Sequence, residues 1–305
     1  MSTESDIRFD DQVVIITGAG TGLGRAYALL FAARGASVIV NDLGGDVHGQ
    51  GGGKNSADQV VDEIKAAGGQ AVACYDSVAT PEGGKAIIDT AMQNYGRVDA
   101  LIHNAGILRD KSFLKLSSDD VRDVMDVHLN AAFWVSQPAF EVMKQQNFGR
   151  IAFTTSASGL FGNFGQANYG AAKTGLIGLM RVLSIEGARY DIKINCVAPS
   201  ARTRMTEDLL GPLTEHLDPR HVAPLLAYLC SSQCEFTNEI FSAGGGRFAR
   251  VFLGLGPGWY SGGDIADPET IAEHIEAIRN VDNFIIPKTG IEEVEVLLTT
   301  LGVQP

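Results

Sequence analysis

The fold is decided near the amino terminus by the stretch QVVIITGAGTGLG, residues 12–24. Its first half, Gln12 to Thr17, is a short β-branched apolar run, as expected of a parallel strand that is buried on both faces. A glycine-rich turn follows at once, and the next residues, RAYALLF from Arg25, favour a helix. A strand, a glycine turn and a helix start together predict a pyrophosphate site, because the backbone can approach phosphates closely and the helix N-terminus carries positive partial charge.

A second strand is predicted at Ser37 to Asn41 and ends at Asp42. A carboxylate about 20 residues beyond the glycines can accept hydrogen bonds from an adenosine ribose, and it would repel a 2′-phosphate. This position therefore predicts NAD rather than NADP as the cofactor. The alternative interpretations are a strand-end cap for Asp42 and an ordinary tight turn for the glycines.

Predicted strands and helices alternate along the chain, which indicates an α/β fold with a doubly wound parallel sheet of Rossmann type. Further strands are expected near Ala71 to Tyr75, Asp99 to His103, Gly149 to Thr155, Ile192 to Ala198 and Phe241 to Gly246, and a helix at Ser56 to Ala67. Residues 1–246 are therefore predicted to form one dinucleotide-binding domain that contains the catalytic site.

Residues 247–305 are predicted to be a C-terminal extension. Amphipathic helices are expected in it at Asp267 to Asn280 and at Gly290 to Leu301. The extension either packs on the same domain, where it would cover the substrate cleft, or pads an oligomer interface. Both possibilities stay open at the level of sequence.

Three side chains suited to alcohol oxidation follow at Ser156, Tyr169 and Lys173. Tyr169 and Lys173 are four residues apart in a helix-like run, so the phenol and the ammonium share one face. A tyrosine of pKa about 10 is a poor base at neutral pH, and a nearby ammonium is expected to lower that pKa. Tyr and Lys at this spacing also occur by chance on many helices, so the pair indicates an active site only together with the glycine turn near the amino terminus.

Four motifs in this order resemble those of the short-chain dehydrogenases/reductases. They are TGAGTGLG at Thr17 to Gly24, Asn104-Ala105-Gly106 after a strand, Ser156, and the YxxxK pair at Tyr169 to Lys173. The resemblance covers roughly residues 10–246. The stretches RAYA from Arg25, VNDLGGD from Val40, NAGILRD from Asn104 and GNFGQANY from Gly162 are similar to one branch: the (3R)-hydroxyacyl-CoA dehydrogenase domain of multifunctional enzyme type 2, also called 17β-hydroxysteroid dehydrogenase type 4, with its single-domain bacterial relatives.

This resemblance implies a catalytic set and a cofactor site. Tyr169 would take the proton of a secondary alcohol that Ser156 also hydrogen-bonds, and Lys173 would tune the tyrosine and bind the nicotinamide ribose. The implied cofactor contacts are Gly18, Thr21, Gly22, Leu23, Gly24, Asp42, Asp76, Ser77, Asn104, Ala105, Gly106, Tyr169, Lys173, Pro199 and Thr203.

Two positions depart from the wider family. Its asparagine in a V-N-L context, which helps to hold a proton-relay water, is replaced by His128, and Asn130 lies about 200° around a helix from that position. Either His128 holds the water itself or it is a hydrogen-bonded core histidine. Ser200 follows Pro199 where the family usually has a glycine, which concerns only the local turn.

The branch implies oxidation of a (3R)-3-hydroxyacyl-CoA to the 3-oxoacyl-CoA with NAD, in β-oxidation-type lipid or steroid catabolism. A 17β-hydroxysteroid is the nearest alternative substrate, and a steroid-derived acyl-CoA would reconcile the two. An NAD-binding sensor without turnover is a further alternative, which the complete catalytic set disfavours. Cations in two loops are expected to form either a basic rim suited to CoA phosphates or a solvated charged face. They are Arg109, Lys111, Lys115, Arg202 and Arg204.

The composition is that expected of a cytoplasmic enzyme. A chain of 305 residues with 45% apolar content can bury a large core, and a net charge of −12 argues against nucleic acid as a partner. No apolar stretch has the length of a membrane span, Met1 to Asp11 has no signal-peptide core, and residues 302–305 are not a peroxisomal address. The chain is also expected to end before the hydratase and lipid carrier of the multifunctional relatives could fit.

The four cysteines fit a reducing compartment better than a disulfide framework. Cys230 and Cys234, with His216 and His221 upstream, match no standard zinc spacing, so no metal is predicted.

The helix that carries Tyr169 and Lys173 continues to Leu183, apolar on more than one face and small on part of it. Such a helix is buried within its domain or packed against a partner. Relatives pair through this helix and the preceding one, near residues 120–146, so a two-fold homodimer, or a tetramer of such pairs, is predicted. The alternative is a monomer in which residues 247–305 cover the extra face.

Overall fold

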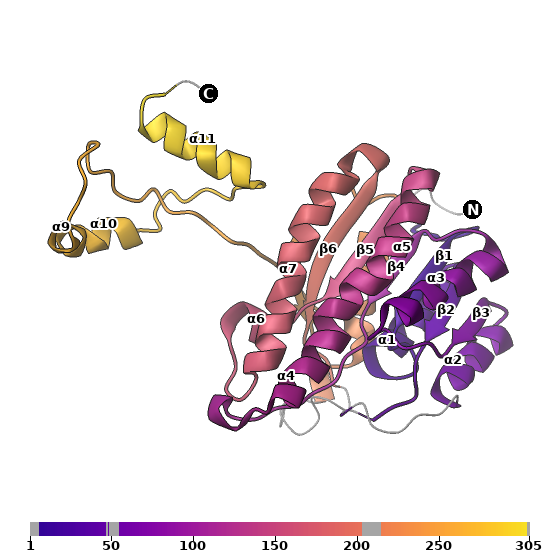
Figure 1. The fold of residues 1–305 in the computed structure, drawn as a ribbon. Coiled ribbons are helices and arrows are strands. Elements are labelled where there is room, and N and C mark those ends of the chain that lie inside the picture. The colour runs from indigo at the N-terminus through magenta and orange to yellow at the C-terminus, as the bar shows by residue number, and fades with distance from the viewer. Residues whose placement is uncertain (1–5, 47, 49–54, 203–214, 304–305) are drawn as a thin grey trace. The chain divides into compact units, whose positions relative to one another are not determined.

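The computed structural model describes residues 6–46, 48, 55–202 and 215–303. The chain forms two compact units, Met1–Arg250 and Val251–Pro305. The first unit contains the whole sheet, and the second contains three short helices, α9, α10 and α11 (Figure 1).

One eight-stranded sheet with the strand order β3-β2-β1-β4-β5-β6-β7-β8 forms the centre of the first unit. The strands are β1 (Val13–Thr17), β2 (Ser37–Asn41), β3 (Gln70–Cys74), β4 (Ala100–His103), β5 (Gly149–Thr154), β6 (Ile192–Pro199), β7 (Ile240–Gly244) and β8 (Arg247–Val251). Neighbours from β3 to β7 pair in parallel. The order reverses between β1 and β4, which makes this point the topological switch point of a Rossmann-type sheet.

Helices cover both faces of the sheet (Figure 1). One layer contains α1 (Gly22–Ala33), α2 (Asn55–Ala66) and α8 (Ala223–Cys230), and the other contains α3 (Pro81–Tyr95), α4 (Ser118–Met125), α5 (Ala131–Gln146) and α7 (Ala167–Gly187). The short helices η1 (Phe113–Lys115), α6 (Ala157–Phe161), η3 (Ala188–Tyr190) and η5 (Pro219–His221) lie in the connections. The doubly wound α/β fold that the sequence predicted is confirmed.

The β-branched run that opens the chain behaves as a strand covered on both sides. All five residues of β1 are buried. Val14 and Ile16 face the layer of α1 and pack in one cluster with Tyr27 and Phe31 of that helix. Because side chains alternate along a strand, two cores form, and strands between two helical layers become apolar throughout.

The sheet continues further than the sequence predicted. β7 ends at Gly244, and a turn at Gly245 and Gly246 leads into β8. Both turn glycines have positive φ, 57° and 80°, as a two-residue hairpin of type I′ requires. The expected domain boundary after residue 246 is therefore corrected: these glycines are a turn inside the sheet, and the first unit extends to Arg250.

Helices α4 and α5 form one continuous helix with a single π-helical turn between them, η2 (Asp126–Asn130). His128 lies in this turn and is buried. The helix begins with a reciprocal cap, in which Ser117 and Asp120 each accept a hydrogen bond from the other's backbone N–H. A π-turn inserts one extra residue into a helix, and such turns are frequent at functional sites.

The second unit has no buried side chain among its described residues. Its helices are α9 (Pro268–Glu273), α10 (Ile275–Arg279) and α11 (Gly290–Thr300). The single helix expected at residues 267–280 is broken at His274, whose ring stacks on Trp259 with 4.0 Å between centroids. In the part of the chain that the structure describes, no helix is long and apolar enough to cross a membrane.

Candidate active site

A cavity of about 560 Å³ opens at the carboxyl ends of the central strands, where the strand order reverses. Of the residues that the sequence predicted, it brings together Gly18, Thr21, Gly22, Leu23, Asp42, Ser77, Asn104, Ala105, Gly106, Ser156, Tyr169, Lys173 and Pro199. Gly24 and Asp76 do not line this cavity. Thr203 lies outside the described residues.

The glycine turn is shaped by close backbone approach. Gly18 has a φ of 64°, and a Cβ there would lie 2.8 Å from Ala105 Cα. A Cβ at Gly24 would lie only 2.1 Å from the Gly18 carbonyl oxygen, so Gly24 serves the packing of α1 against β1 rather than the cavity. Helix α1 begins at Gly22 with no acidic residue in its first turn, which leaves its positive end suited to an anion.

Asp42 is fixed between two loops at the edge of the cavity. Its carboxylate accepts hydrogen bonds from the backbone N–H of Gly20 (2.8 Å) and of Gly44 (2.7 Å). The adjacent Asn41, which the sequence did not single out, also lines the cavity, and its amide donates to the Asp76 carbonyl oxygen at 2.9 Å. The backbone of Asp76 is thus held by Asn41 while its side chain is exposed, and of the predicted pair Asp76 and Ser77 only Ser77 lines the cavity, together with Val78.

The Asn104-Ala105-Gly106 turn is attached to β1 by hydrogen bonds. Thr17 Oγ1 accepts from the backbone N–H of Asn104 (3.0 Å) and of Ala105 (3.1 Å). Asn104 Nδ2 donates to the carbonyl oxygens of Thr17 (3.1 Å) and Gly18 (3.2 Å). The end of β4 and the glycine turn are therefore one rigid element on the floor of the cavity.

Ser156 and Tyr169 meet on the opposite wall. Ser156 is the N-cap of α6, and its Oγ accepts a hydrogen bond from the Ser158 N–H at 3.2 Å. Burial raises the pKa of the Tyr169 phenol, and the hydrogen bond from Ser156 opposes this shift. The expected lowering of that pKa by Lys173 is not what the structure shows, because desolvation of the phenolate outweighs the favourable contacts.

Lys173 lies beneath the tyrosine and is fully buried. Its Nζ donates to the Thr154 carbonyl oxygen at 2.6 Å and lies 5.6 Å from the centroid of the Tyr169 ring. Burial lowers the pKa of Lys173 to about 7, because the charged form loses its hydration. The ammonium is thus anchored to β5 rather than bonded to the phenol.

His128 closes the wall between the tyrosine and the Asn104 turn. Its ring stands edge-on to Tyr169 with 5.1 Å between centroids, and its Nε2 lies 3.0 Å from the Ile107 nitrogen and 2.8 Å from the Ile107 oxygen. Its Nδ1 is buried and has no hydrogen-bond partner among the described residues. Burial holds the pKa of His128 well below its usual value, with the Lys173 charge as a second cause.

His103 supports this wall from within the sheet. Its Nε2 lies 3.0 Å from the His128 carbonyl oxygen, close enough to donate to it. Burial lowers the pKa of His103 to about 4, and the charge of Lys173 acts in the same direction. The sequence left two interpretations of His128 open, a hydrogen-bonded core histidine and a residue that holds a proton-relay water. The contacts with Ile107 are those of a core histidine. The buried Nδ1, which has no partner among the described residues, is the atom that a water-holding histidine would offer.

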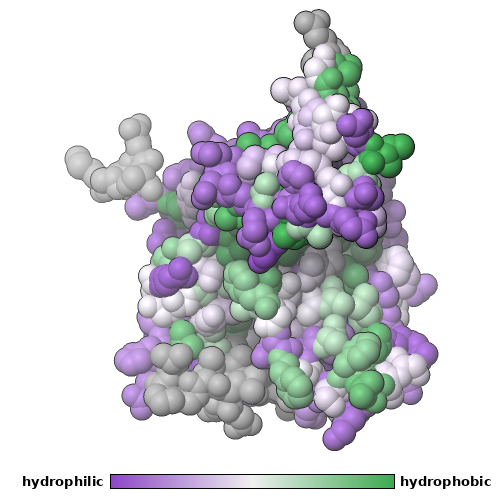
Figure 2. All heavy atoms as spheres, turned by 90° about the vertical axis from the view of Figure 1, so that its left-hand side faces the viewer, coloured by the Kyte–Doolittle hydropathy of each residue, from purple (hydrophilic) through white to green (hydrophobic). Residues whose placement is uncertain are grey.

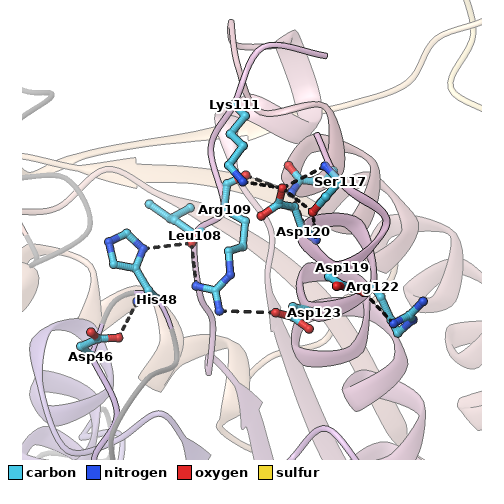
Figure 3. Close-up of polar contacts among 11 residues, drawn as sticks. Asp46, His48, Leu108, Arg109, Lys111, Ser117, Asp119, Asp120, Arg122 and Asp123 are labelled. Atoms are coloured by element: carbon cyan, nitrogen blue, oxygen red, sulfur yellow. Dashed lines mark hydrogen bonds and ion pairs between the residues drawn. The ribbon is translucent and has the colours of Figure 1, made fainter. Parts of the chain in front are cut away.

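Charged groups at the outer end of the cavity are arranged as ion pairs (Figure 3). Arg109 lies 3.4 Å from Asp123, and Lys111 lies 2.6 Å from Asp120. Hydrogen bonds from Lys111 and Ser117 hold the pKa of the Asp120 carboxyl well below its usual range. The predicted basic rim is therefore partly neutralised by acidic residues of α4. Of its other members, Lys115 and Arg202 are exposed, and Arg204 lies outside the described residues.

The segment that follows β2 reaches the same end of the cavity. His48 Nδ1 lies 3.2 Å from the Leu108 carbonyl oxygen, and the His48 N–H donates to Asp46 at 2.9 Å (Figure 3). All three residues line the cavity; Asp46 and Leu108 lie in the VNDLGGD and NAGILRD stretches, whereas no quoted motif contains His48.

Gln166 joins the loops around the cavity mouth. Its amide donates to Asp110 Oδ2 at 2.7 Å, and its carbonyl oxygen accepts from Ser158 Oγ (2.7 Å) and Asn163 Nδ2 (3.0 Å). Gln166 and Asn163 line the cavity, and the only sign of them in the sequence is their place in the GNFGQANY stretch.

No group of His, Cys, Asp or Glu side chains suited to a metal ion occurs within residues 6–46, 48, 55–202 and 215–303. Cys230 and Cys234 are buried free thiols, and burial raises their pKa values.

A family model described as short chain dehydrogenase matches residues 12–211. Peroxisomal multifunctional enzyme type 2 of Mus musculus is 47% identical over 313 residues, which is 99% of this chain and 42% of that protein. A putative short-chain type dehydrogenase/reductase of Mycobacterium tuberculosis is 51% identical over 244 residues, 80% of this chain and 85% of that protein. The solved structure of full-length peroxisomal multifunctional enzyme type 2 from Drosophila melanogaster matches with a TM-score of 0.82 at 39% identity, covering 97% of this chain and 50% of that one. The chain thus spans half or less of the multifunctional relatives.

Proposed function

The chain belongs to the short-chain dehydrogenase family and is a dehydrogenase that acts on a hydroxyl group, and from this premise we propose that it oxidises a (3R)-3-hydroxyacyl-CoA to the 3-oxoacyl-CoA with NAD. The observation that supports this best is that Ser156, Tyr169 and Lys173 line one cavity at the switch point of the sheet. It gives one substrate oxygen two hydroxyl partners within reach of a dinucleotide cradle.

The residues of the cavity fit NAD. Gly18, Gly22 and Gly106 line the cavity without side chains, so a ligand can approach their backbone, and the positive end of α1, at Gly22, lies at the same space. When bound, NAD accepts a hydride from the carbinol carbon at C4 of its nicotinamide. Asp42 supports NAD over NADP, because its fixed carboxylate would meet a 2′-phosphate with like charge.

The proton follows a separate route on the protein. Tyr169, as phenolate, takes the hydroxyl proton of the substrate while Ser156 hydrogen-bonds the same oxygen. The C–H bond breaks with its electron pair, and the oxygen forms the carbonyl double bond. Lys173 lies near the phenolate, where its ammonium form stabilises the negative charge at pH values below its pKa of about 7, and its bond to Thr154 fixes its position. Positioning and general-base transfer are the protein's contribution to the rate.

The experiment that tests this function is a panel of (3R)- and (3S)-3-hydroxyacyl-CoAs and 17β-hydroxysteroids, each with NAD and with NADP. Formation of NADH with the (3R)-thioesters alone supports the proposal. Turnover of the steroids alone would replace it by a hydroxysteroid dehydrogenase. Tight NAD binding without any turnover would identify a sensor.

We further propose that two copies pair through α7. Outside the core face, this helix exposes a row of small and apolar residues: Ala171, Thr174, Gly178, Val182 and Ile185. Small residues allow two helices to approach closely around a two-fold axis. Light scattering at micromolar concentration tests this: a mass near 32.4 kDa contradicts pairing, and a mass near twice or four times that value supports it.

We propose the cytoplasm as the site of action, as the composition and the buried free cysteines favour a reducing compartment. The name of the mouse relative places that protein in the peroxisome. Fractionation of cells that express the tagged chain decides between these locations.

A further inference from the structure

Four large apolar side chains are exposed in two segments that also contain residues lining the cavity, Arg109 in one and Asn163 in the other. Phe113 and Leu114 of η1 are 76% and 95% exposed, and Phe161 and Phe164, at the end of α6 and just after it, are 74% and 90% exposed. Single exposed apolar residues are ordinary, but a contiguous group marks a binding surface. Figure 2 shows groups of hydrophobic side chains on the side of the molecule where α6 lies. We call these four residues the apolar rim.

The two segments that carry the apolar rim are fastened to each other. The Lys111 N–H donates to the Gly165 carbonyl oxygen at 2.9 Å, and Gln166 donates to Asp110 at 2.7 Å. Asn168 Nδ2 also donates to the Arg109 carbonyl oxygen at 3.2 Å. The apolar rim is therefore a built surface on paired segments rather than the tips of two independent loops.

This surface is continuous with the proposed active site. Helix α6 begins directly after its N-cap Ser156 and ends at Phe161, and Asn163, between the two phenylalanines, lines the cavity. On the other side, Leu108 and Arg109 line the cavity a few residues before η1. A group that extends outward from the reacting carbon at Ser156 would therefore leave the cavity across the apolar rim.

The charges around this exit favour an uncharged occupant. Arg109 and Lys111 lie in the same segment as Phe113, and both are held by carboxylates, Asp123 and Asp120. Two of the three cations of this segment are thus paired, and the exit offers phosphate groups mainly the charge of Lys115, which is exposed at the end of η1. Exposed aromatic and aliphatic side chains gain from contact with an apolar chain that also leaves water.

We propose that the apolar rim binds the distal part of the acyl chain of a medium- or long-chain 3-hydroxyacyl thioester. The inference rests on the proposed function and adds to it a preference in chain length. It places the CoA end of the substrate away from the Arg109 and Lys111 side.

The test compares (3R)-hydroxybutyryl-CoA with (3R)-hydroxydodecanoyl-CoA in the full chain. The double variants F161S/F164S and F113S/L114S remove apolar contact without entering the cavity wall. Each is expected to reduce kcat/KM for the dodecanoyl substrate by about tenfold or more and to leave the butyryl substrate within about twofold. Met92→Ser on α3, an exposed apolar residue that does not line the cavity, is the matched control and should change neither.

Other outcomes overturn the inference. An equal decrease of kcat/KM for both substrates, or no decrease for either, means that the apolar rim does not bind the acyl chain. A change in mass by light scattering in the rim variants, with chain-length preference intact, identifies the rim as a contact between copies instead. If the unaltered protein turns over neither thioester, the proposed function fails on its own, and calorimetry then tests the apolar rim separately. Equal affinity for dodecanoyl-CoA and for free CoA rejects the inference. Tighter binding of dodecanoyl-CoA that is lost in F161S/F164S supports it.

Discussion

The two walls of the cavity are stabilised in different ways. The cofactor wall, formed by Gly18, Asp42 and Asn104, consists of backbone groups and short polar side chains joined by hydrogen bonds of 2.7–3.2 Å. The catalytic wall, formed by His128, Tyr169 and Lys173, consists of titratable groups whose pKa values are set mainly by burial. The cofactor wall depends on how closely its backbone groups approach one another, whereas the catalytic wall depends on the desolvation of its titratable side chains. Changes in the first should therefore alter binding, and changes in the second should alter turnover.

The largest expected effect is on the catalytic wall. Tyr169→Phe removes the phenol oxygen with little change in packing, and kcat should fall by about 10³-fold or more, because the general base and its positioning are lost together. Steady-state kinetics measure this, and a fluorescence titration with NADH should show binding within about tenfold of the unaltered protein. A variant that retains a tenth of the original kcat would remove Tyr169 from its assigned role.

The corresponding change on the cofactor wall is Asp42→Ala. Losing hydrogen bonds to a charged group should raise KM for NAD by about 10- to 100-fold and narrow the discrimination against NADP, with kcat little changed. Kinetics with both cofactors measure it. Asp76→Ala is the matched control, because that exposed carboxylate does not line the cavity, and it should leave KM within about twofold. An unaltered protein that already prefers NADP contradicts the assignment.

A third change tests whether the walls are coupled at their point of contact. A Cβ at Gly106 would lie 2.4 Å from His128 Cε1, so Gly106→Ala should lower the free energy of unfolding by about 1–3 kcal/mol. His128→Ala removes the obstructing ring, and Gly106→Ala should be milder in that background. Urea denaturation of the single and double variants gives the coupling, and strictly additive effects would show that the clash relaxes elsewhere.

The smallest expected effect, up to about tenfold per pH unit, is in the pH profile. Since burial raises the pKa of Tyr169, the phenolate is scarce at neutral pH and its fraction grows as pH rises toward that pKa. The kcat/KM for oxidation should thus climb with pH, whereas reduction, which needs the protonated phenol, should not. A flat oxidation profile above neutral pH would mean that the Tyr169 phenolate is already formed there, which contradicts a raised pKa.

The two walls also differ in how far the sequence predicted them. The glycine turn and the Asn104 turn were predicted well, because positive φ and close approach leave glycine few substitutes: Gly18 needs both. The residue spacing placed Tyr169 and Lys173 on one face, but the sign of the tyrosine pKa shift depends on burial, which spacing does not contain. Gly24 and Asp76 were assigned to the cofactor site from neighbours in their motifs, although neither residue lines the cavity.

The charged mouth was predicted only in part. Arg109 and Lys111 were expected in a basic rim or in a solvated charged face, and their pairing with Asp123 and Asp120 was not part of either expectation. These ion pairs form because the chain turns back between Lys111 and α4, and this turn is a feature of the fold that the sequence pattern does not contain. The hairpin at Gly245 and Gly246 shows the opposite case, since two adjacent glycines carried a type I′ signal that had been taken for the end of the sheet.

The π-turn at Asp126–Asn130 constrains the length of the chain more than its composition. An α-helix advances about 100° per residue, and the extra residue of a π-turn sets the rotational phase of α5 relative to α4. Deleting one residue there would restore regular helical bonding and rotate the buried face of α5, with Val135 and Ala139, away from the sheet. We therefore expect this helix to reject any single-residue insertion or deletion around position 128.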